Sequence, residues 1–430
     1  MDFSEWLKNN DTIKSYAHFD NRVKIGDVIS KIQDKENIIH HSFMPFIHYT
    51  QKFKKFSKKH NQILRKDKDR ELYYSAHYDR CIYQYYAFLL NEKYNEFLRA
   101  KNLENTAIAY RNNLHKSNIE FSKEAFDFIK KHKQCYIIVS DFKNFFDKLN
   151  HSYLKVKLCQ VLGCSKLPDD WYAVFKNITK FSWVNLEDIL ELFGMENNLK
   201  NKRLINKKRI LVPIAELRKS KELINKNKNN YGIPQGSAIS AILSNVYMIE
   251  FDKKLKEYIE RLGGKYLRYS DDSIFIIPNI NEEECIKVYN TILTEVSSVP
   301  DLDMQKEKTK IYEYNETEIV NKNTIIGIES SCDKLDYLGF TFDGKNICLR
   351  DKTITKYYYR TYHKVDSLKK SKSKQKTRNE LYEIYTLKGC EKRLNFLTYA
   401  KRCRKVYGKK EKVNSIFNKH MSKIKSRIED

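Results

Sequence analysis

The stretch KYLRYSDDSIFIIPN, residues 265–279, constrains the fold of this chain more than any other. Two adjacent acids, Asp271 and Asp272, separate two runs of Tyr, Leu, Ile and Phe that suit a buried sheet. Asp is common in solvated turns, so the pair by itself would indicate little. Apolar segments on both sides instead predict two strands whose connecting turn places two like charges at the edge of a core sheet.

A third acid ends another apolar run. CYIIVSDF, residues 135–142, is a short β-rich segment that reaches Asp141. If this strand neighbours the strands of 265–277, Asp141 and Asp271 meet at one sheet edge. Carboxylates that repel one another are tolerated when a cation neutralises them, and three of them form a site for hard divalent cations. We expect two Mg²⁺ ions there, or Mn²⁺ in their place, held by Asp141, Asp271 and Asp272.

The remaining patterns predict a mixed α+β protein. Apolar residues at helical spacing predict a helix over 74–98, and FFDKLNHSYLKVKLCQVLG predicts another after the first strand. Residues 237–262 predict one long amphipathic helix, and 335–350 predict a hairpin that turns at Asp343-Gly344. The Asn- and Lys-rich residues 196–230 are interpreted as a surface excursion, and the C-terminal part as basic helices.

The charge of the chain indicates a polyanionic partner. It has 81 Lys plus Arg against 55 Asp plus Glu, a formal net charge of +26. Residues 350–430 hold 25 basic and 8 acidic residues, so +17 of that charge lies in the last 81 residues. A solvated helix face is the alternative for any single basic run. For the whole tail we expect nucleic-acid contact.

Cysteine usage and hydropathy predict a cytoplasmic protein. The nine cysteines include no CxxC pair, which favours free thiols. The N-terminus has no apolar signal region, and no run of about 18 apolar residues occurs. We therefore expect no membrane partner.

Four motifs together resemble the palm of reverse transcriptases. DFKNFFDKLNH, YGIPQGSAISAILSN, YSDD and LDYLGF occur in the order and approximate spacing of that family, over residues from about Phe43 to about Phe342. The resemblance implies a right-hand polymerase fold. Its parts would be an N-terminal region and fingers (1–134), a palm (135–334) with the basic excursion near 196–230, a primer-grip hairpin (335–350) and a helical basic thumb and tail (351–430).

The resemblance also implies roles for the catalytic residues. Asp141 and Asp271 match the two metal-bridging aspartates, and Asp272 matches the supporting acid. Lys308 matches the lysine that protonates the leaving pyrophosphate, although Lys306 and Lys310 lie beside it in sequence, and LDYLGF matches the primer grip. The four primer-grip residues are Tyr337, Leu338, Gly339 and Phe340.

Substrate-binding residues are carried over in the same way. Phe146 matches the aromatic that lies under the incoming sugar and excludes a 2′-hydroxyl; a plain core Phe is the alternative. Gln235 and Gly236 match the loop that approaches the nascent base pair. The basic residues of KDKDREL match those that hold the triphosphate, with Arg70 preferred over Lys68; a surface charge cluster is the alternative. Arg111 is a further candidate contact to template or nucleotide.

The basic tail is predicted to hold RNA through its phosphates. The tyrosines at 357–359 stand between basic residues and would stack on bases, or else form a buried aromatic stripe. The candidate nucleic-acid-binding residues are Lys356, Arg360, Lys401, Arg402, Arg404 and Lys405.

Missing features narrow the resemblance within the family. No VTG motif of the retron kind, no maturase or endonuclease segment and no long C-terminal helical-repeat domain is found. The chain then resembles the short type-2 class of bacterial defence-associated reverse transcriptases. That class implies a structured non-coding RNA as template and scaffold, deoxynucleoside triphosphates as substrates and a DNA product made in phage defence. Alternatives are a template-independent DNA polymerase of an abortive-infection system, a polymerase that makes RNA, and a non-catalytic RNA-binding scaffold.

Overall fold

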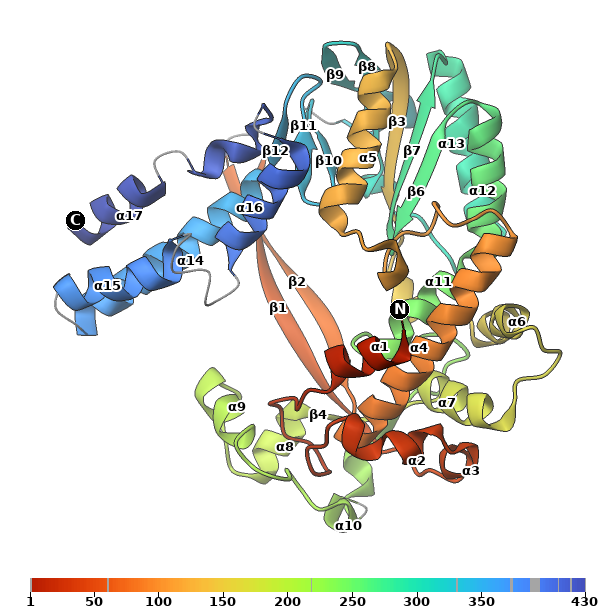
Figure 1. The fold of residues 1–430 in the computed structure, drawn as a ribbon, viewed down its shortest axis with the longest axis vertical. Coiled ribbons are helices and arrows are strands. Elements are labelled where there is room, and N and C mark those ends of the chain that lie inside the picture. Colours follow the sequence, from red (N-terminus) through yellow and green to blue (C-terminus); the bar gives the residue numbers. More distant parts are fainter. Residues whose placement is uncertain are drawn as a thin grey trace. The chain divides into compact units, whose positions relative to one another are not determined.

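The fold of the 430-residue chain is given by a computed structural model, drawn in Figure 1. Every helix and strand named below lies within the residues that it describes. These are residues 2–59, 62–217, 219–329, 332–371, 374–386, 395–408, 410–417 and 420–429, with side chains described except at 53–59, 62–68, 371, 374–378 and 414.

The chain forms two compact units, each assembled from separate stretches of sequence. Unit 1 comprises Met1–Asn113, Phe142–Lys254 and Thr294–Asp303. Unit 2 comprises Leu114–Asp141, Leu255–Leu293 and Met304–Asp430. The domain boundaries expected at 134/135, 334/335 and 350/351 stay predictions.

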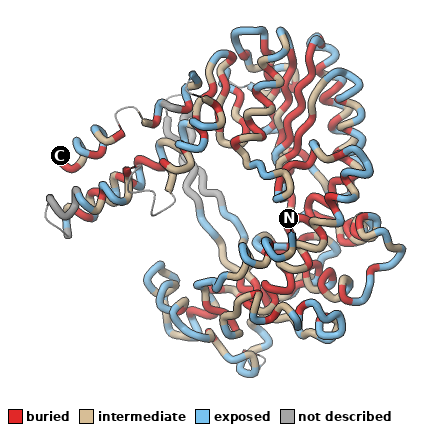
Figure 2. Tube along the Cα trace, in the orientation of Figure 1, coloured by how far each residue is buried: buried red, intermediate tan, exposed pale blue. Residues whose placement is uncertain are grey.

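Unit 2 is built around a five-stranded antiparallel sheet in the order β6-β7-β3-β8-β9. Five of the eight residues of β3 and six of the seven residues of β7 are buried, and Figure 2 shows these strands mainly in red. Helix α5 lies on one side of the sheet and α12 and α13 on the other (Figure 1). The bounds are α5 Asn118–Lys131, β3 Gln134–Asp141, α12 Ile249–Arg261, β6 Lys265–Tyr269, β7 Asp272–Pro278, α13 Glu282–Ser297, β8 Lys310–Asn315 and β9 Glu318–Asn321.

A second, three-stranded sheet of unit 2 corrects the expected single hairpin over 335–350. The expected turn is present, because Asp343 N donates to Asn346 O over 3.3 Å. An additional turn at Leu338 and Gly339 divides the first arm, and both residues have positive φ, +47° and +94°. Asn118 of α5 donates to the Leu338 carbonyl over 2.9 Å and so supports this conformation. The strands are β10 Leu335–Tyr337, β11 Phe340–Phe342 and β12 Ile347–Leu349.

The C-terminal part of unit 2 is helical and basic, as predicted. One apolar cluster is made of Val365, Leu368, Leu381, Ile424 and Ile428, contributed by α14, α15 and α17. Helix α16 packs on α5 instead, where Ser122 and the Tyr407 hydroxyl share a 2.6 Å hydrogen bond. The bounds are α14 Asp351–Ser371, α15 Lys374–Tyr385, α16 Phe396–Tyr407 and α17 His420–Glu429.

Unit 1 is mostly helical around the predicted helix α4 (His77–Ala100) and carries a sheet in the order β2-β1-β4-β5. Near the start of α4, Asp79 accepts from the Met44 amide over 2.8 Å and contacts His41 at 2.6 Å. The other bounds are α1 Phe3–Asn10, α2 Ile29–Gln33, α3 Lys35–Ile39, β1 Phe46–Lys59, β2 Gln62–Tyr74, α6 His151–Leu162, α7 Asp169–Thr179, β4 Ser182–Asn185, α8 Leu186–Leu192, α9 Leu199–Ile205, α10 Ile214–Leu217, β5 Asn225–Lys226 and α11 Ala238–Tyr247.

Two predicted helices are broken in the structure. The helix expected over 237–262 divides at Met248 into α11 and α12, and nothing local in the sequence marks that break. The helix expected after β3 becomes a short 3₁₀ turn, Phe145–Lys148, followed by α6. Here a tertiary contact decides, because the Leu149 carbonyl accepts from Gly232 N over 2.9 Å instead of continuing a helix.

The surface excursion expected at 196–230 is only partly correct. Ile205, Leu211 and Leu217 are buried in the apolar cluster that also contains Ile47 and Val184. The segment is therefore an anchored part of unit 1 that carries exposed polar residues between apolar ones.

Candidate active site

The turn between β6 and β7 holds the adjacent acids. Tyr269 pairs with Asp272, which leaves Ser270 and Asp271 as a two-residue turn. Ser270 has φ +62°, the left-handed conformation that tight hairpins place at this position. The fully buried Arg268 donates to the Ser270 carbonyl over 2.9 Å. The buried Arg268 side chain thus holds the turn in place, and nothing in the sequence pattern predicted this role.

Asp141 reaches the same place from the neighbouring strand. It is the last residue of β3, and it stands directly opposite Asp272 in the antiparallel β3–β7 register. The structure therefore brings Asp141, Asp271 and Asp272 to one edge of the sheet. These three residues are called the carboxylate edge below.

The carboxylate edge is electrostatically unfavourable on its own. Burial and the charge of Asp141 raise the pKa of Asp271 above its usual value. Burial, followed by repulsion from Asp271 and Asp141, raises the pKa of Asp272 to about 7, while the charge of Arg350 acts in the opposite direction. Each shift means that the protein disfavours the ionised carboxylate. Added positive charge at this edge would relieve the repulsion.

Lys308 supplies part of that charge. Its Nζ lies 2.5 Å from Asp141 Oδ2, and the Asp141 carbonyl accepts from Gln305 N over 3.0 Å in the turn that carries the lysine. Of the three lysines 306, 308 and 310, only Lys308 has a described ion pair with the carboxylate edge. The sequence did not decide which of these three lysines lies at the carboxylate edge, and the structure identifies Lys308.

The donor set of the carboxylate edge suits a hard divalent cation. Among the described residues, no group of three or more His, Cys, Asp or Glu side chains is arranged to hold a metal ion. The Asp141 carboxylate is engaged by Lys308, while Asp271 and Asp272 disfavour ionisation. Oxygen-only donors with excess negative charge are the ligands that Mg²⁺ prefers. The three aspartates therefore fit such an ion chemically.

Arg350 connects the three-stranded sheet with the carboxylate edge. This residue follows β12, donates from Nε to Asp336 Oδ1 over 2.6 Å and from its backbone N to the Gly339 carbonyl over 3.0 Å. Its charge also acts on Asp272. Arg350, like Asn118, has no local motif, so only the tertiary structure could identify it.

The four predicted primer-grip residues divide into two pairs. Tyr337 and Phe340 are fully buried, and the Tyr337 hydroxyl has no hydrogen-bond partner among the described residues. Leu338 and Gly339 form the partly exposed turn between them. The buried pair supports the turn, and the turn residues are the ones accessible to a ligand.

The residues predicted to contact a nucleotide lie in unit 1. Gly236 has φ +123°, and a Cβ at this position would lie 2.3 Å from the Tyr73 carbonyl oxygen. Gln235 O accepts from Tyr73 N over 2.9 Å, which ties the Gln235–Gly236 loop to β2. The Phe146 carbonyl accepts from Ile233 N over 3.0 Å, and the Phe146 ring is half-buried. Phe146, Gln235 and Gly236 are therefore held together by backbone contacts.

The predicted basic contacts of unit 1 have different outcomes. Arg70 is exposed on β2, whereas the side chain of Lys68 lies outside the described residues. Arg111 is 3% exposed, and its guanidinium donates to Asn95 Oδ1 over 2.8 Å and to the Ala107 carbonyl over 3.0 Å. This position does not support a contact to template or nucleotide, because the arginine is already bound inside the protein.

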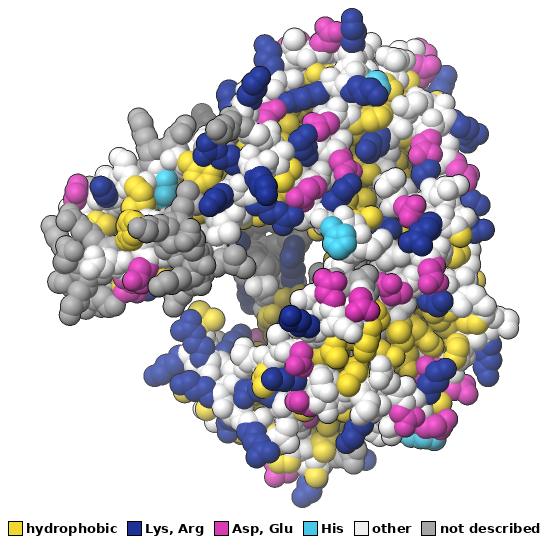
Figure 3. Space-filling view, in the orientation of Figure 1, with side chains coloured by type: hydrophobic (Ala, Val, Ile, Leu, Met, Phe, Trp, Pro, Cys, Tyr) yellow, Lys and Arg dark blue, Asp and Glu magenta, His cyan; other side chains and the backbone are white. Residues whose placement is uncertain are grey.

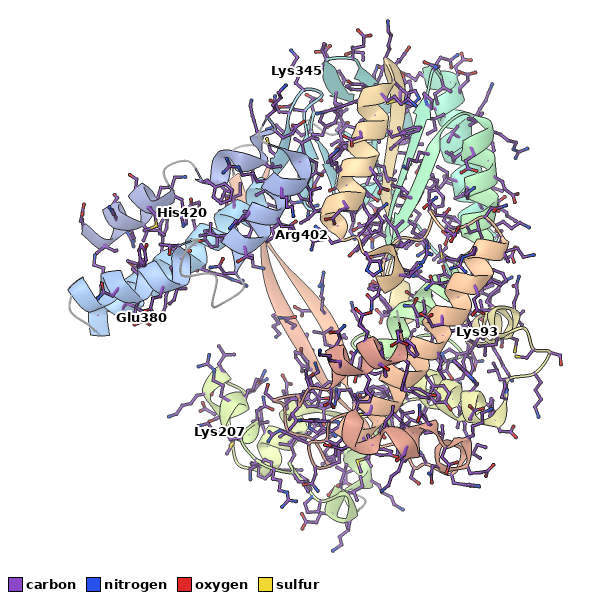
Figure 4. The ribbon with its side chains drawn as sticks, in the orientation of Figure 1. Lys93, Lys207, Lys345, Glu380, Arg402 and His420 are labelled. Atoms are coloured by element: carbon purple, nitrogen blue, oxygen red, sulfur yellow. The ribbon has the colours of Figure 1, made fainter. Side chains whose placement is uncertain are left out.

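The basic residues of the tail also differ from one another. Arg402, labelled in Figure 4, makes a two-oxygen ion pair with Glu120 of α5 at 2.9 and 3.1 Å, so it holds α16 in place. Tyr357 and Tyr358 are buried beside His420, as the aromatic-stripe alternative expects, but Tyr359 is 64% exposed. The remaining predicted contacts, Lys356, Arg360, Lys401, Arg404 and Lys405, are all exposed.

The α+β fold class predicted for a right-hand polymerase is confirmed, with many helices, two antiparallel sheets and one mixed sheet in which β1 and β4 are parallel. The family model described as "Reverse transcriptase (RNA-dependent DNA polymerase)" matches residues 89–342. These are 254 of the 430 residues, and the chain belongs to this family. A search of curated proteins finds no match.

Solved structures of telomerases are similar to this chain. Apo telomerase from Candida tropicalis without its C-terminal domain aligns with TM-score 0.37 and 14% identity, over 69% of this chain and 54% of that one. Apo telomerase from Candida tropicalis aligns with TM-score 0.40 and 12% identity, over 93% and 70%. Telomerase from Candida albicans in complex with a fragment of telomeric RNA aligns with TM-score 0.39 and 12% identity, over 99% and 69%.

Two further expectations concern the chain as a whole. Every described cysteine is a free thiol, as predicted. Within the described parts of the chain, a search for helices that could span a bilayer finds none.

Proposed function

We propose that this protein is an RNA-directed DNA polymerase whose reaction takes place at the carboxylate edge. The observation that carries the proposal is the convergence of Asp141, Asp271 and Asp272 from two adjacent strands, with the pKa of two of the three raised by burial and mutual repulsion. Strained like charges of this kind are typical of functional sites. Membership of the reverse transcriptase family supports the same chemistry.

The three aspartates have distinct proposed roles. Asp141 and Asp271 would hold two Mg²⁺ ions, and Asp272 would support them. When bound, these ions lower the pKa of the attacking 3′-hydroxyl and neutralise charge on the leaving pyrophosphate. Lys308 already lies against Asp141, so its ammonium is available to give a proton to the pyrophosphate as it leaves.

Nucleotide binding is assigned to residues of unit 1. Arg70, with Lys68 beside it in sequence, would hold the triphosphate, since a guanidinium matches phosphate oxygens in pairs. At position 236 the backbone approaches β2 so closely that only glycine, which has no side chain, fits there. Phe146, held by the same loop, would exclude a 2′-hydroxyl and select deoxynucleotides.

The polyanionic partner is proposed to be RNA, which serves as template and scaffold. The exposed tail residues Lys356, Arg360, Lys401, Arg404 and Lys405 would contact phosphates. Arg402 is removed from this set because it already binds Glu120. The finer biological proposal rests on resemblance alone. In this proposal the protein is a bacterial defence-associated enzyme that copies an associated non-coding RNA into DNA during phage infection.

One experiment tests the catalytic proposal. Asp271→Ala combined with Asp272→Ala is expected to abolish DNA synthesis from all four deoxynucleotides in the presence of Mg²⁺. Products of the wild-type protein should be complementary to the RNA that co-purifies with it. Synthesis by the double variant would exclude the carboxylate edge as the active site, and products unrelated to the bound RNA would exclude templated synthesis.

A further inference from the structure

A basic segment of unit 1 has no role in the chemistry above. Residues 199–228 contain 11 Lys or Arg and two Glu, a net charge of +9. Figure 3 shows dark blue side chains at the lower left, where α9 lies in Figure 1. The residues 199–228 are called the basic segment. Its exposed basic residues are Lys200, Arg203, Lys207, Lys208, Arg209, Lys219, Lys221, Lys226 and Lys228.

The described part of the basic segment has no charge partners of opposite sign. Among the described residues, none of its Lys or Arg side chains forms an ion pair with a carboxylate, whereas Lys254 on α12 pairs with Glu295 at 2.8 Å. A solvated helix face normally mixes charges of both signs, so this surface is prepared for an anionic ligand.

The basic segment is also firmly positioned. Leu211 N donates to the His18 carbonyl over 2.8 Å, and Asn206 Oδ1 accepts from Ala17 N over 3.0 Å. Its buried leucine and isoleucine side chains pack under β1 and β4. The exposed lysines therefore extend from a fixed base, and Figure 4 marks Lys207 at the surface just after α9.

An aromatic cleft adjoins these lysines. It has a volume of about 380 Å³, and it is bounded by β1, β2, α9 and the loop of Gly236. Four partly exposed tyrosines line it, and Lys202 of α9 and Asn206, which follows that helix, add polar groups. The residues of this tyrosine cleft are Tyr16, Tyr49, Leu72, Tyr73, Tyr74, Leu186, Lys202, Asn206 and Gly236.

We propose that the tyrosine cleft and the basic segment together bind single-stranded RNA. Aromatic faces stack on unpaired bases, and a track of basic residues follows the backbone. Lys202 belongs to both features, so it connects the base site with the phosphate track. The naming of RNA rather than DNA rests on the proposed function, whereas the preference for a single strand rests on the cleft.

The phosphate track is tested by charge reversal in a catalytically silent background, Asp271→Asn with Asp272→Asn. Lys200→Glu, Arg203→Glu and Lys207→Glu are introduced together, and binding of a fluorescein-labelled unstructured RNA is followed by anisotropy at several salt concentrations. The affinity should fall at least tenfold, and the slope of log K against log salt should decrease by about 2, at roughly 0.7 for each lost phosphate contact.

A matched control carries the same change of charge elsewhere. Lys131→Glu, Lys287→Glu and Lys345→Glu alter exposed lysines that have no described ion pair. This control should keep the salt slope of the parent protein. Equal losses in both triple variants would overturn the proposal, because they would reflect net charge alone. Unchanged RNA affinity in the test variant would also overturn it, and would favour a protein partner for α9, whose Leu199 is 74% exposed.

The base site is tested separately with Tyr49→Leu, which keeps an apolar side chain of similar reach. Loss of one stacked base predicts about a five- to hundredfold weaker affinity for single-stranded RNA with an unchanged salt slope. Lys202→Met provides a second variant if Tyr49→Leu lowers the thermal midpoint. Because Lys202 also belongs to the phosphate track, this variant should weaken binding and lower the salt slope by about 0.7. Equal weakening for duplex RNA, or no weakening for single strands, would overturn the cleft assignment.

These results are separable from the test of catalysis. A wild-type protein that binds RNA through the basic segment but makes no DNA would overturn only the proposed function. A charge-reversed protein that still binds RNA as tightly as its parent would overturn only the present inference.

Discussion

The carboxylate edge of unit 2 and the basic segment of unit 1 both concentrate like charges, but they hold them in different ways. The three aspartates are fixed by strand register and a tight turn, and burial raises the pKa of Asp271 and Asp272. The lysines of the basic segment are exposed on an anchored base, without described ion pairs.

The difference reflects the cost of a charge in each environment. Like charges crowded at one partly exposed sheet edge are expensive, so they are kept only where geometry must be exact to fractions of an ångström. An exposed charge costs little and is screened by salt, so many can be displayed for a ligand of variable shape. The first arrangement suits chemistry at one point, and the second suits binding along a strand.

The largest expected effect concerns the cation at the carboxylate edge. Lys308→Ala should lower kcat by about 10²–10⁴-fold, the usual contribution of a general acid. Lys306→Ala, which alters a neighbouring exposed lysine in the same turn, should change kcat less than twofold. Single-turnover incorporation of a deoxynucleotide measures both. Equal effects of the two variants would mean that proximity to Asp141 does not identify the acid.

The next effect tests whether the nucleotide loop depends on close backbone approach. Gly236→Ala should destabilise the protein by roughly 1–3 kcal/mol, because a Cβ would lie 2.3 Å from the Tyr73 carbonyl oxygen at φ +123°. It should also weaken nucleotide binding. Gly194→Ala is the matched control, since Gly194 has φ +62° but no atom within 4 Å of its Cβ. Denaturant unfolding should show the larger loss for Gly236→Ala.

A pH effect should distinguish the crowded carboxylates from the basic segment. The pKa of Asp272 is about 7 in the folded protein against 3.8 ordinarily, so the folded state binds its proton more tightly than the unfolded state does. This contribution to stability is present below about pH 4 and is lost as the pH rises to about 7.

The measurement compares thermal midpoints of metal-free wild-type protein and Asp272→Asn between pH 4 and 8. The difference between the two thermal midpoints should change from about pH 4 to about pH 7 and be constant from pH 7 to pH 8. Lys207→Gln, a change in the basic segment, should leave the pH profile of the wild type intact. A constant difference for Asp272→Asn across the whole range would contradict the raised pKa.

The smallest expected effect concerns the tail. Arg402→Ala should cost about 0.2–1 kcal/mol of stability, the usual value for a partly exposed ion pair, because it releases Glu120. Lys405→Ala should leave stability unchanged and weaken RNA binding slightly. Urea unfolding and anisotropy distinguish the two. A larger loss of RNA affinity for Arg402→Ala than for Lys405→Ala would return Arg402 to the RNA-binding set.

Local pattern was sufficient where neighbours in sequence decide the structure. The apolar runs on either side of Asp271–Asp272 predicted β6 and β7, and CYIIVSD predicted β3. It was insufficient where a distant segment supplies the hydrogen-bond partner. The backbone of Gly232 ends the predicted helix at Leu149, and Asn118 supports the unexpected turn at Leu338.

The sequence by itself determined the acids, the strands that carry them, the family and the basic character of the chain, because these follow from residue type and spacing. Only the tertiary structure decided which charged side chains are already bound to other groups of the protein. Arg111 and Arg402 are bound to protein acceptors, Lys308 is the one of three lysines with a described ion pair to Asp141, and the described Lys and Arg side chains of the basic segment form no ion pair with a carboxylate. A side chain's partners depend on which distant residues folding brings within hydrogen-bond distance, and no local pattern contains that information.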